Sequence, residues 1–245
     1  MMPTIEPFFV RAAKEALTEL DHEADAEFID VTKRYMAQEA QHHGQHVMFN
    51  RILNKRYRTV PFLDRAIGWA YETVEQRGSS QFKVGVAAAS ETMAYSAARW
   101  AAGRRTELFA GADEVTATLF LWHLAEEVEH KSVAHDLYWN IYGDRRTARV
   151  RYIGAMAVAL TLLVLFATVG TTLLLAEERR LLNPVSWFRL TVWGFGFAFE
   201  LLSNLVISLL PGHHPSRFSD PLWFEVWLRE FDAEAGTMPI WDVTS

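Results

Sequence analysis

The sequence predicts an all-α protein in which a four-helix bundle is followed by an apolar helical hairpin that crosses a membrane. Three observations support this fold class. Within the segments of residues 1–150, Gly and Pro are sparse while Ala, Leu, Glu and Arg are frequent, as is typical of helices. No run of alternating polar and apolar residues indicates a strand. Residues 152–176, finally, contain no charged side chain.

The bundle helices are predicted from where Gly, Pro and short polar clusters interrupt the chain. The interruptions fall at 21–22, 57–61, 77–80, 103–111 and 143. The predicted helices therefore cover 6–20, 24–54, 61–77, 79–103 and 112–142, with 61–77 as a short connecting helix. We expect the bundle to occupy residues 1–150, the hairpin 151–212 and an interfacial tail 213–245.

The hairpin is predicted from two apolar stretches. The 25 residues 152–176 would form a helix about 37 Å long, enough to cross a hydrocarbon core of about 30 Å. The second stretch, 190–210, contains Glu200 near its middle, where a carboxyl group would face a partner helix, stay protonated or line a polar cavity. We expect the chain to turn between them at 177–184.

The charges around the hairpin predict its orientation. Arg145, Arg146, Arg149 and Arg151 precede the first stretch, which places the bundle on the cytoplasmic side by the positive-inside rule. The N-terminus lacks the basic and apolar regions of a signal peptide, so we expect the protein at the cytoplasmic membrane. The tail segment 218–231 is either an amphipathic helix at the membrane interface or a strap on the bundle; the tail carries Trp223, Trp227 and Trp241.

Composition restricts the chemistry. The chain has no cysteine, which excludes disulfide scaffolds, thiolate zinc sites and cysteine nucleophiles. A net charge of −6, from 24 basic and 30 acidic residues, argues against nucleic-acid binding. Any metal must therefore be held by His and carboxylate side chains.

Two Glu-x-x-His motifs supply such side chains. They are Glu39-x-x-His42 and Glu127-x-x-His130, and each places a carboxylate and an imidazole on one face of a helix. Two further carboxylates, Glu6 and Glu91, lie at matching heights on the helices expected to pair with the motif helices. One Glu from each of two helices, with Glu-x-x-His from the other two, is the ligand set of a di-metal carboxylate bundle.

Alternatives remain for several positions. Glu15 and Glu19 lie on the same predicted helix as Glu6, but one to two turns off the level of the motifs. Because Pro7 disfavours a helical conformation of the preceding residue, we expect Glu6 at the N-cap. Possible additional ligands, or residues that hold the ligands by hydrogen bonds, are His46, His43 and Glu126, while His22, His135, His213 and His214 are expected at the surface.

These motifs resemble those of known families. The chain is similar to the bacterial family labelled "predicted metal-dependent hydrolase", and residues 1–150 resemble the ferritin-like di-iron superfamily. The shared features are Pro-x-x-Glu-x-Phe-Phe at 3–9, Gln-Glu-x-x-His-x-x-x-His at 38–46, Glu91, and His-x-x-Glu-Glu-x-Glu-His at 123–130. His123, four residues before Glu127, resembles the seventh ligand of the di-iron arylamine N-oxygenases and is expected to bind metal.

These features predict an enzyme with two metal ions, most readily Fe, with Mn or Zn as alternatives. The favoured function is a membrane-associated non-haem di-iron oxygenase or oxidase, with a lipophilic small molecule and O₂ as substrates and an external electron donor. One alternative is a di-metal hydrolase that uses a metal-activated water. A second alternative is a non-catalytic metal-binding membrane protein. The lipid bilayer is an expected partner, and a homodimer is one possible assembly.

Overall fold

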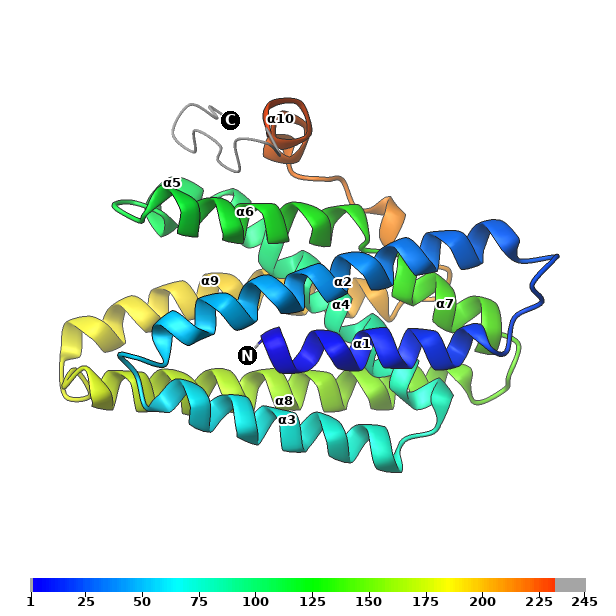
Figure 1. Cartoon of the computed structure of the whole chain (residues 1–245), viewed down its shortest axis with the longest axis horizontal. Helices are drawn as coiled ribbons and strands as arrows, with labels where there is room; N and C mark the ends of the chain where they lie inside the picture. Colours follow the sequence, from blue (N-terminus) through cyan, green and yellow to red (C-terminus); the bar gives the residue numbers. More distant parts are fainter. Residues whose placement is uncertain (1, 232–245) are drawn as a thin grey trace. The chain divides into compact units, whose positions relative to one another are not determined.

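The computed structural model describes residues 2–231, which form helices and no strand (Figure 1). The all-α prediction is therefore confirmed for this part of the chain; Trp241 lies outside it. The helices are α1 Met2–Leu17, α2 Ala26–Leu53, α3 Thr59–Arg77, α4 Ser80–Ala102, α5 Arg105–Leu108, α6 Glu114–Glu129, α7 Val133–Tyr142, α8 Ala148–Glu177, α9 Pro184–Ser208, the 3₁₀ turn η1 Pro215–Arg217, and α10 Leu222–Glu230.

The first helix begins earlier than predicted, because Pro7 lies inside α1 rather than at its boundary. In a regular helix the N–H of residue 7 would donate to the carbonyl of residue 3, and proline has no N–H. The carbonyl oxygen of Pro3 instead accepts a hydrogen bond from Nδ1 of His43 on α2, at 2.7 Å. A side chain from α2 thus replaces the missing backbone donor, and Glu6 lies within the helix instead of at its N-cap.

The predicted helix 112–142 is divided into α6 and α7. The turn between them begins at His130, which is the C-cap of α6, with its N–H bonded to the carbonyl of Glu126. No Gly or Pro marks this turn in the sequence, which is why the periodicity did not predict it. Within the turn, Lys131 forms an ion pair with Asp220.

The chain divides into two compact units. The first consists of the residues up to Ser90 together with Val133–Val192. The second consists of Glu91–Ser132 together with the chain from Trp193 onward, so the boundary falls inside α4 and inside α9. The predicted division at residues 150 and 212 remains a prediction.

In the first unit, α1 packs against α2, α3 and α7, and α3 also packs against α8. Phe8 and Tyr71 meet edge-to-face in this core, with ring centroids 5.2 Å apart. Phe8 and Ile67 are fully buried. Apolar residues on the inward faces of α1 and α3 thereby fix α1, which carries Glu6, against its neighbours.

In the second unit, α10 packs against α6. Trp223 and Trp227 of α10 are buried with Ala117, Leu121 and Ala125 of α6. Of the two interpretations of the tail segment, the structure therefore supports a strap on the helical core, because α10 packs against α6.

Glu200 of α9 lies in the second unit, and its Oε1 is 3.2 Å from the Nε of Arg99 on α4. Its carboxylate also accepts a hydrogen bond from Asn204 at 3.2 Å. The first of the three predicted environments, a partner helix, is therefore the one observed.

Helices α8 and α9 are long and apolar enough to cross a membrane, and only a small share of each is buried. They are separated by residues 178–183, at the turn that the sequence predicts.

Candidate metal centre

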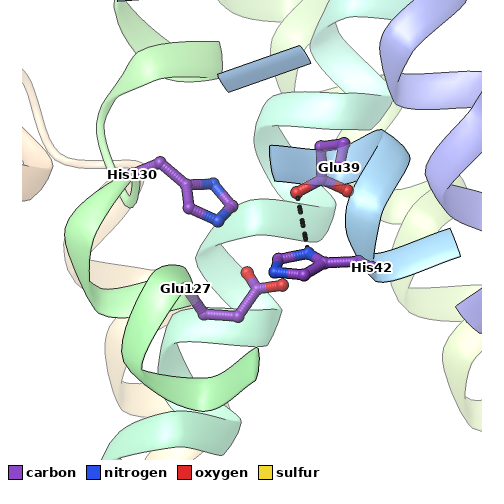
Figure 2. Close-up of side chains that lie close together, drawn as sticks. All are labelled: Glu39, His42, Glu127 and His130. Atoms are coloured by element: carbon purple, nitrogen blue, oxygen red, sulfur yellow. Dashed lines mark ion pairs between the residues drawn. The ribbon is translucent and has the colours of Figure 1, made fainter. Parts of the chain in front are cut away.

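The first unit contains two buried Glu–His pairs. On α2, Glu39 Oε1 lies 3.5 Å from His42 Nδ1, and Figure 2 shows both side chains with this interaction as a dashed line. Their spacing of three residues brings the two side chains together on one face of the helix. The second pair joins two helices: Glu6 Oε1 on α1 lies 3.8 Å from His46 Nε2 on α2. All four side chains are buried, and Glu6 is fully inaccessible to solvent.

The other acidic candidates of the predicted helix 6–20, Glu15 on α1 and Glu19 in the turn after it, have different surroundings. Glu15 is exposed and forms an ion pair with Lys83. Glu19 is also exposed, and it accepts a hydrogen bond from the hydroxyl of Tyr142 at 2.6 Å. Of the three candidates on this helix, only Glu6 is buried beside a histidine.

The second unit also contains buried Glu–His pairs. On α6, Glu127 Oε1 lies 2.9 Å from His123 Nε2, one helical turn away. Glu91 Oε2 on α4 lies 3.4 Å from His130 Nδ1. In Figure 2, Glu127 projects from the end of α6, and His130 follows it in the chain. All four residues are buried.

Several expectations from the sequence are changed or refined. His43 is half-buried and is a hydrogen-bond donor to Pro3. Glu126 is half-buried, and the neighbouring Glu129 is exposed.

The expectation of a surface position is wrong for His135, which is buried. Its ring packs edge-on against Tyr152, with centroids 6.4 Å apart, and its Nδ1 is 3.2 Å from a carboxylate oxygen of Asp136. Such a burial depends on tertiary packing against α8, for which the local pattern around residue 135 has no signal.

Burial determines the protonation state of His46. Burial, together with the neighbouring His42, lowers the pKa of His46 to about 4. His46 is therefore a neutral imidazole near pH 7, which is the form that binds metal. Carboxylates buried in such number are costly unless cations or hydrogen bonds compensate them.

The donor set fits a metal ion. Each unit has buried Glu and His side chains of the kinds that bind metal, and the four side chains drawn in Figure 2 are among them. Carboxylate oxygen and imidazole nitrogen suit iron, manganese and zinc. Such groups can hold a metal ion, orient a metal-bound molecule or accept a proton from it.

Comparison with protein families gives one informative result. A family model described as "Predicted metal-dependent hydrolase" matches residues 1–218. No curated protein and no solved structure matches the chain.

Proposed function

Because the chain belongs to the family of predicted metal-dependent hydrolases, we propose that it holds a pair of metal ions in a buried active site. The proposed ligands are Glu6, Glu39, His42, Glu91, His123, Glu127 and His130. His46 is proposed as an eighth ligand or as a residue that positions Glu6.

The observation that carries this proposal is the repetition of one arrangement. Each unit buries two carboxylates, each within 4 Å of an imidazole. One carboxylate of each unit belongs to a Glu-x-x-His motif, and the other lies on a different helix. Two motifs and two separate carboxylates are the usual complement of a di-metal site in a helical bundle.

The neighbouring residues have supporting roles. His43 fixes the N-terminal turn of α1, and thereby the position of Glu6, through its bond to Pro3. Neutral His46 can accept a proton near Glu6. Glu126 lies next to Glu127 in the chain and is proposed to hold the metal ligands in place by hydrogen bonds without binding the metal itself.

We propose O₂-dependent oxidation of a lipophilic small molecule as the reaction. The donor set supports it: hard carboxylates with imidazoles favour iron, which when bound supplies redox chemistry with O₂. The electrons would come from an external donor. The proposed site lies on the cytoplasmic side of the membrane, and the apolar helices α8 and α9 support a substrate taken from lipid.

Hydrolysis is the second candidate, and the family description favours it. In that case the metal pair lowers the pKa of a bound water. The same proposed ligands serve both reactions, so the metal and its response to O₂ distinguish them.

The test is elemental analysis of the detergent-purified protein, followed by optical and Mössbauer spectra of anaerobically reduced protein exposed to O₂. Two irons per chain and an O₂-dependent absorbance change are expected. Zinc without any absorbance change would reject the oxidation proposal and leave hydrolysis. Glu127→Gln should lose metal, whereas the matched control Glu129→Gln on the exposed face of α6 should retain it.

A further inference from the structure

Both ends of helix α8 are bound to other helices of the first unit. At its start, the hydroxyl of Tyr138 donates to the carbonyl of Ala148, and Arg151 donates to Gln81 of α4 at 3.1 Å. At its end, the carboxylate of Glu177 accepts hydrogen bonds from the N–H groups of Arg58 and Thr59, at 2.6 and 3.1 Å. Glu177 thus caps the N-terminus of α3, where unbonded N–H groups and the helix dipole attract a carboxylate.

The next residue strengthens this connection. Glu178 Oε1 accepts hydrogen bonds from the guanidinium of Arg56 and the hydroxyl of Tyr57, both at 2.8 Å. The turn between α2 and α3 is therefore bound to the C-terminal end of α8 by two adjacent carboxylates.

Between these ends, α3 runs alongside α8, as Figure 1 shows. The approach is close at Gly170, where a Cβ atom would lie 3.0 Å from a methyl carbon of Leu63. Thr59 lies at Glu177, the last residue of α8, whereas Leu63, one turn further along α3, lies at Gly170, about two turns before that end. The two helices are therefore antiparallel. Any orientation of α8 relative to a membrane therefore applies to α3 as well.

α3 is poorly suited to the interior of a bilayer. It carries Asp64 and Arg65 in its second turn and Glu72, Glu75 and Arg77 towards its end, and Glu75 is paired with Arg11 of α1. If α8 crossed the membrane, these charges would enter the hydrocarbon, and Arg56 would have to reach the far side. Ionised side chains at that depth are strongly disfavoured.

The outer face of α8 is nevertheless apolar. Val150, Ile153, Val164 and Leu165 are exposed, and their spacing along the helix places them in one stripe. The stripe lies opposite the buried face that includes Gly170. Beyond the C-terminal end of α8, Leu182 and Phe188 are also exposed, at 94% and 70%. We call these residues the apolar stripe.

Exposed arginines flank the apolar run at both ends. Arg149 and Arg151 lie at its start, and Arg179, Arg180 and Arg189 follow its end. A helix that crosses the membrane is expected to have such cations concentrated at its cytoplasmic end. Cations at both ends fit two ends that meet the same anionic lipid surface. A second copy of this chain would bring the same cations against one another, which disfavours the stripe as a dimer interface.

We propose that the apolar stripe docks into one leaflet of the cytoplasmic membrane, with α8 parallel to the membrane plane and both its ends on the cytoplasmic side. The arginines at both ends bind anionic headgroups, and the apolar side chains enter the acyl region. This inference rests on the membrane association in the proposed function, but it is independent of the metal, the ligands and the reaction.

The absence of cysteine makes a direct topology test possible, because each introduced thiol is the only one in the chain. Arg180→Cys reports the far end of α8, and Glu23→Cys, in the turn between α1 and α2, is the matched control. A membrane-impermeant maleimide should label neither variant in intact spheroplasts and both in inverted vesicles. Labelling of Arg180→Cys alone in intact spheroplasts would show that α8 spans the membrane and would overturn the inference.

Docking is tested by flotation of purified protein with vesicles of zwitterionic and anionic phospholipid. Val164→Lys with Leu165→Lys should lower the bound fraction about tenfold or more, since lysine is strongly disfavoured in acyl chains. The control places two lysines at the exposed Ala24 and Ala26 and should bind as the unsubstituted protein does. The inference would be overturned if the unsubstituted protein did not float with the vesicles. It would also be overturned if the protein formed a soluble dimer that the stripe substitutions broke. Loss of metal alone would not bear on it.

Discussion

Substitution of His43 with alanine should destabilise the protein without removing metal. The His43 side chain supplies the hydrogen bond that Pro7 cannot give to the carbonyl of Pro3, at 2.7 Å. Pro3 is buried, and an unsatisfied buried acceptor costs about 1–3 kcal/mol. Because His43 is half-buried, water can enter in its place, so we expect the low end, about 1 kcal/mol. This corresponds to a fall in Tm of about 2–4 °C for a domain of this size.

A double-mutant cycle isolates this bond. Pro7→Ala restores a backbone N–H that can donate to Pro3, so His43→Ala should cost less in that background, by about 0.5 kcal/mol or more. The assay is urea denaturation of all four proteins in detergent, with His22→Ala as the control at an exposed histidine. Equal costs of His43→Ala in both backgrounds would refute the capping role. Loss of metal from His43→Ala with unchanged stability would instead show that His43 is a ligand.

Two other predictions concern parts of the fold away from the metal residues. Trp227→Ala should lower the free energy of unfolding by about 3–5 kcal/mol, because it leaves a cavity between α10 and α6. The control Leu228→Ala, at an exposed position, should change it by less than about 0.5 kcal/mol in urea denaturation. Equal effects of the two substitutions would contradict the packing of α10 as a strap. Hydrogen bonds from the N–H groups of Ala24 and Glu23 hold the pKa of Asp21 below its ordinary value of 3.8. The contribution of Asp21 to stability should therefore be present above pH 3.8 and disappear as the pH falls through the folded-state pKa. An NMR titration that gives Asp21 a pKa at or above 3.8 would contradict this.

The sequence predicts the helical fold and the hairpin turn because their signals are local. The uncharged run and Pro184 mark the end of α8 and the start of α9 in the chain itself. The turn at His130 has no such mark, and α1 extends through Pro7 only because a residue 40 positions away from Pro3 supplies the missing bond. These two features depend on tertiary contacts, which periodicity does not encode.

Among the candidate site residues, the sequence spacing predicts which Glu and His side chains of one helix lie together, because the helical repeat determines it. Glu39 and His42 lie one turn apart, as their numbering implies, and so do His123 and Glu127. The pairings of Glu6 with His46 and of Glu91 with His130 join different elements, and the sequence gives only their approximate levels. The burial of His135 and the partner of Glu200 are likewise tertiary.

The most direct test of the central proposal is the number of metal ions per chain, measured by elemental analysis on one variant from each unit. The unsubstituted protein should contain two. Glu39→Gln in the first unit and Glu91→Gln in the second should each lower that number, because both residues are proposed ligands. Retention of two metal ions per chain in both variants, or their absence from the unsubstituted protein, would contradict the proposed two-metal centre.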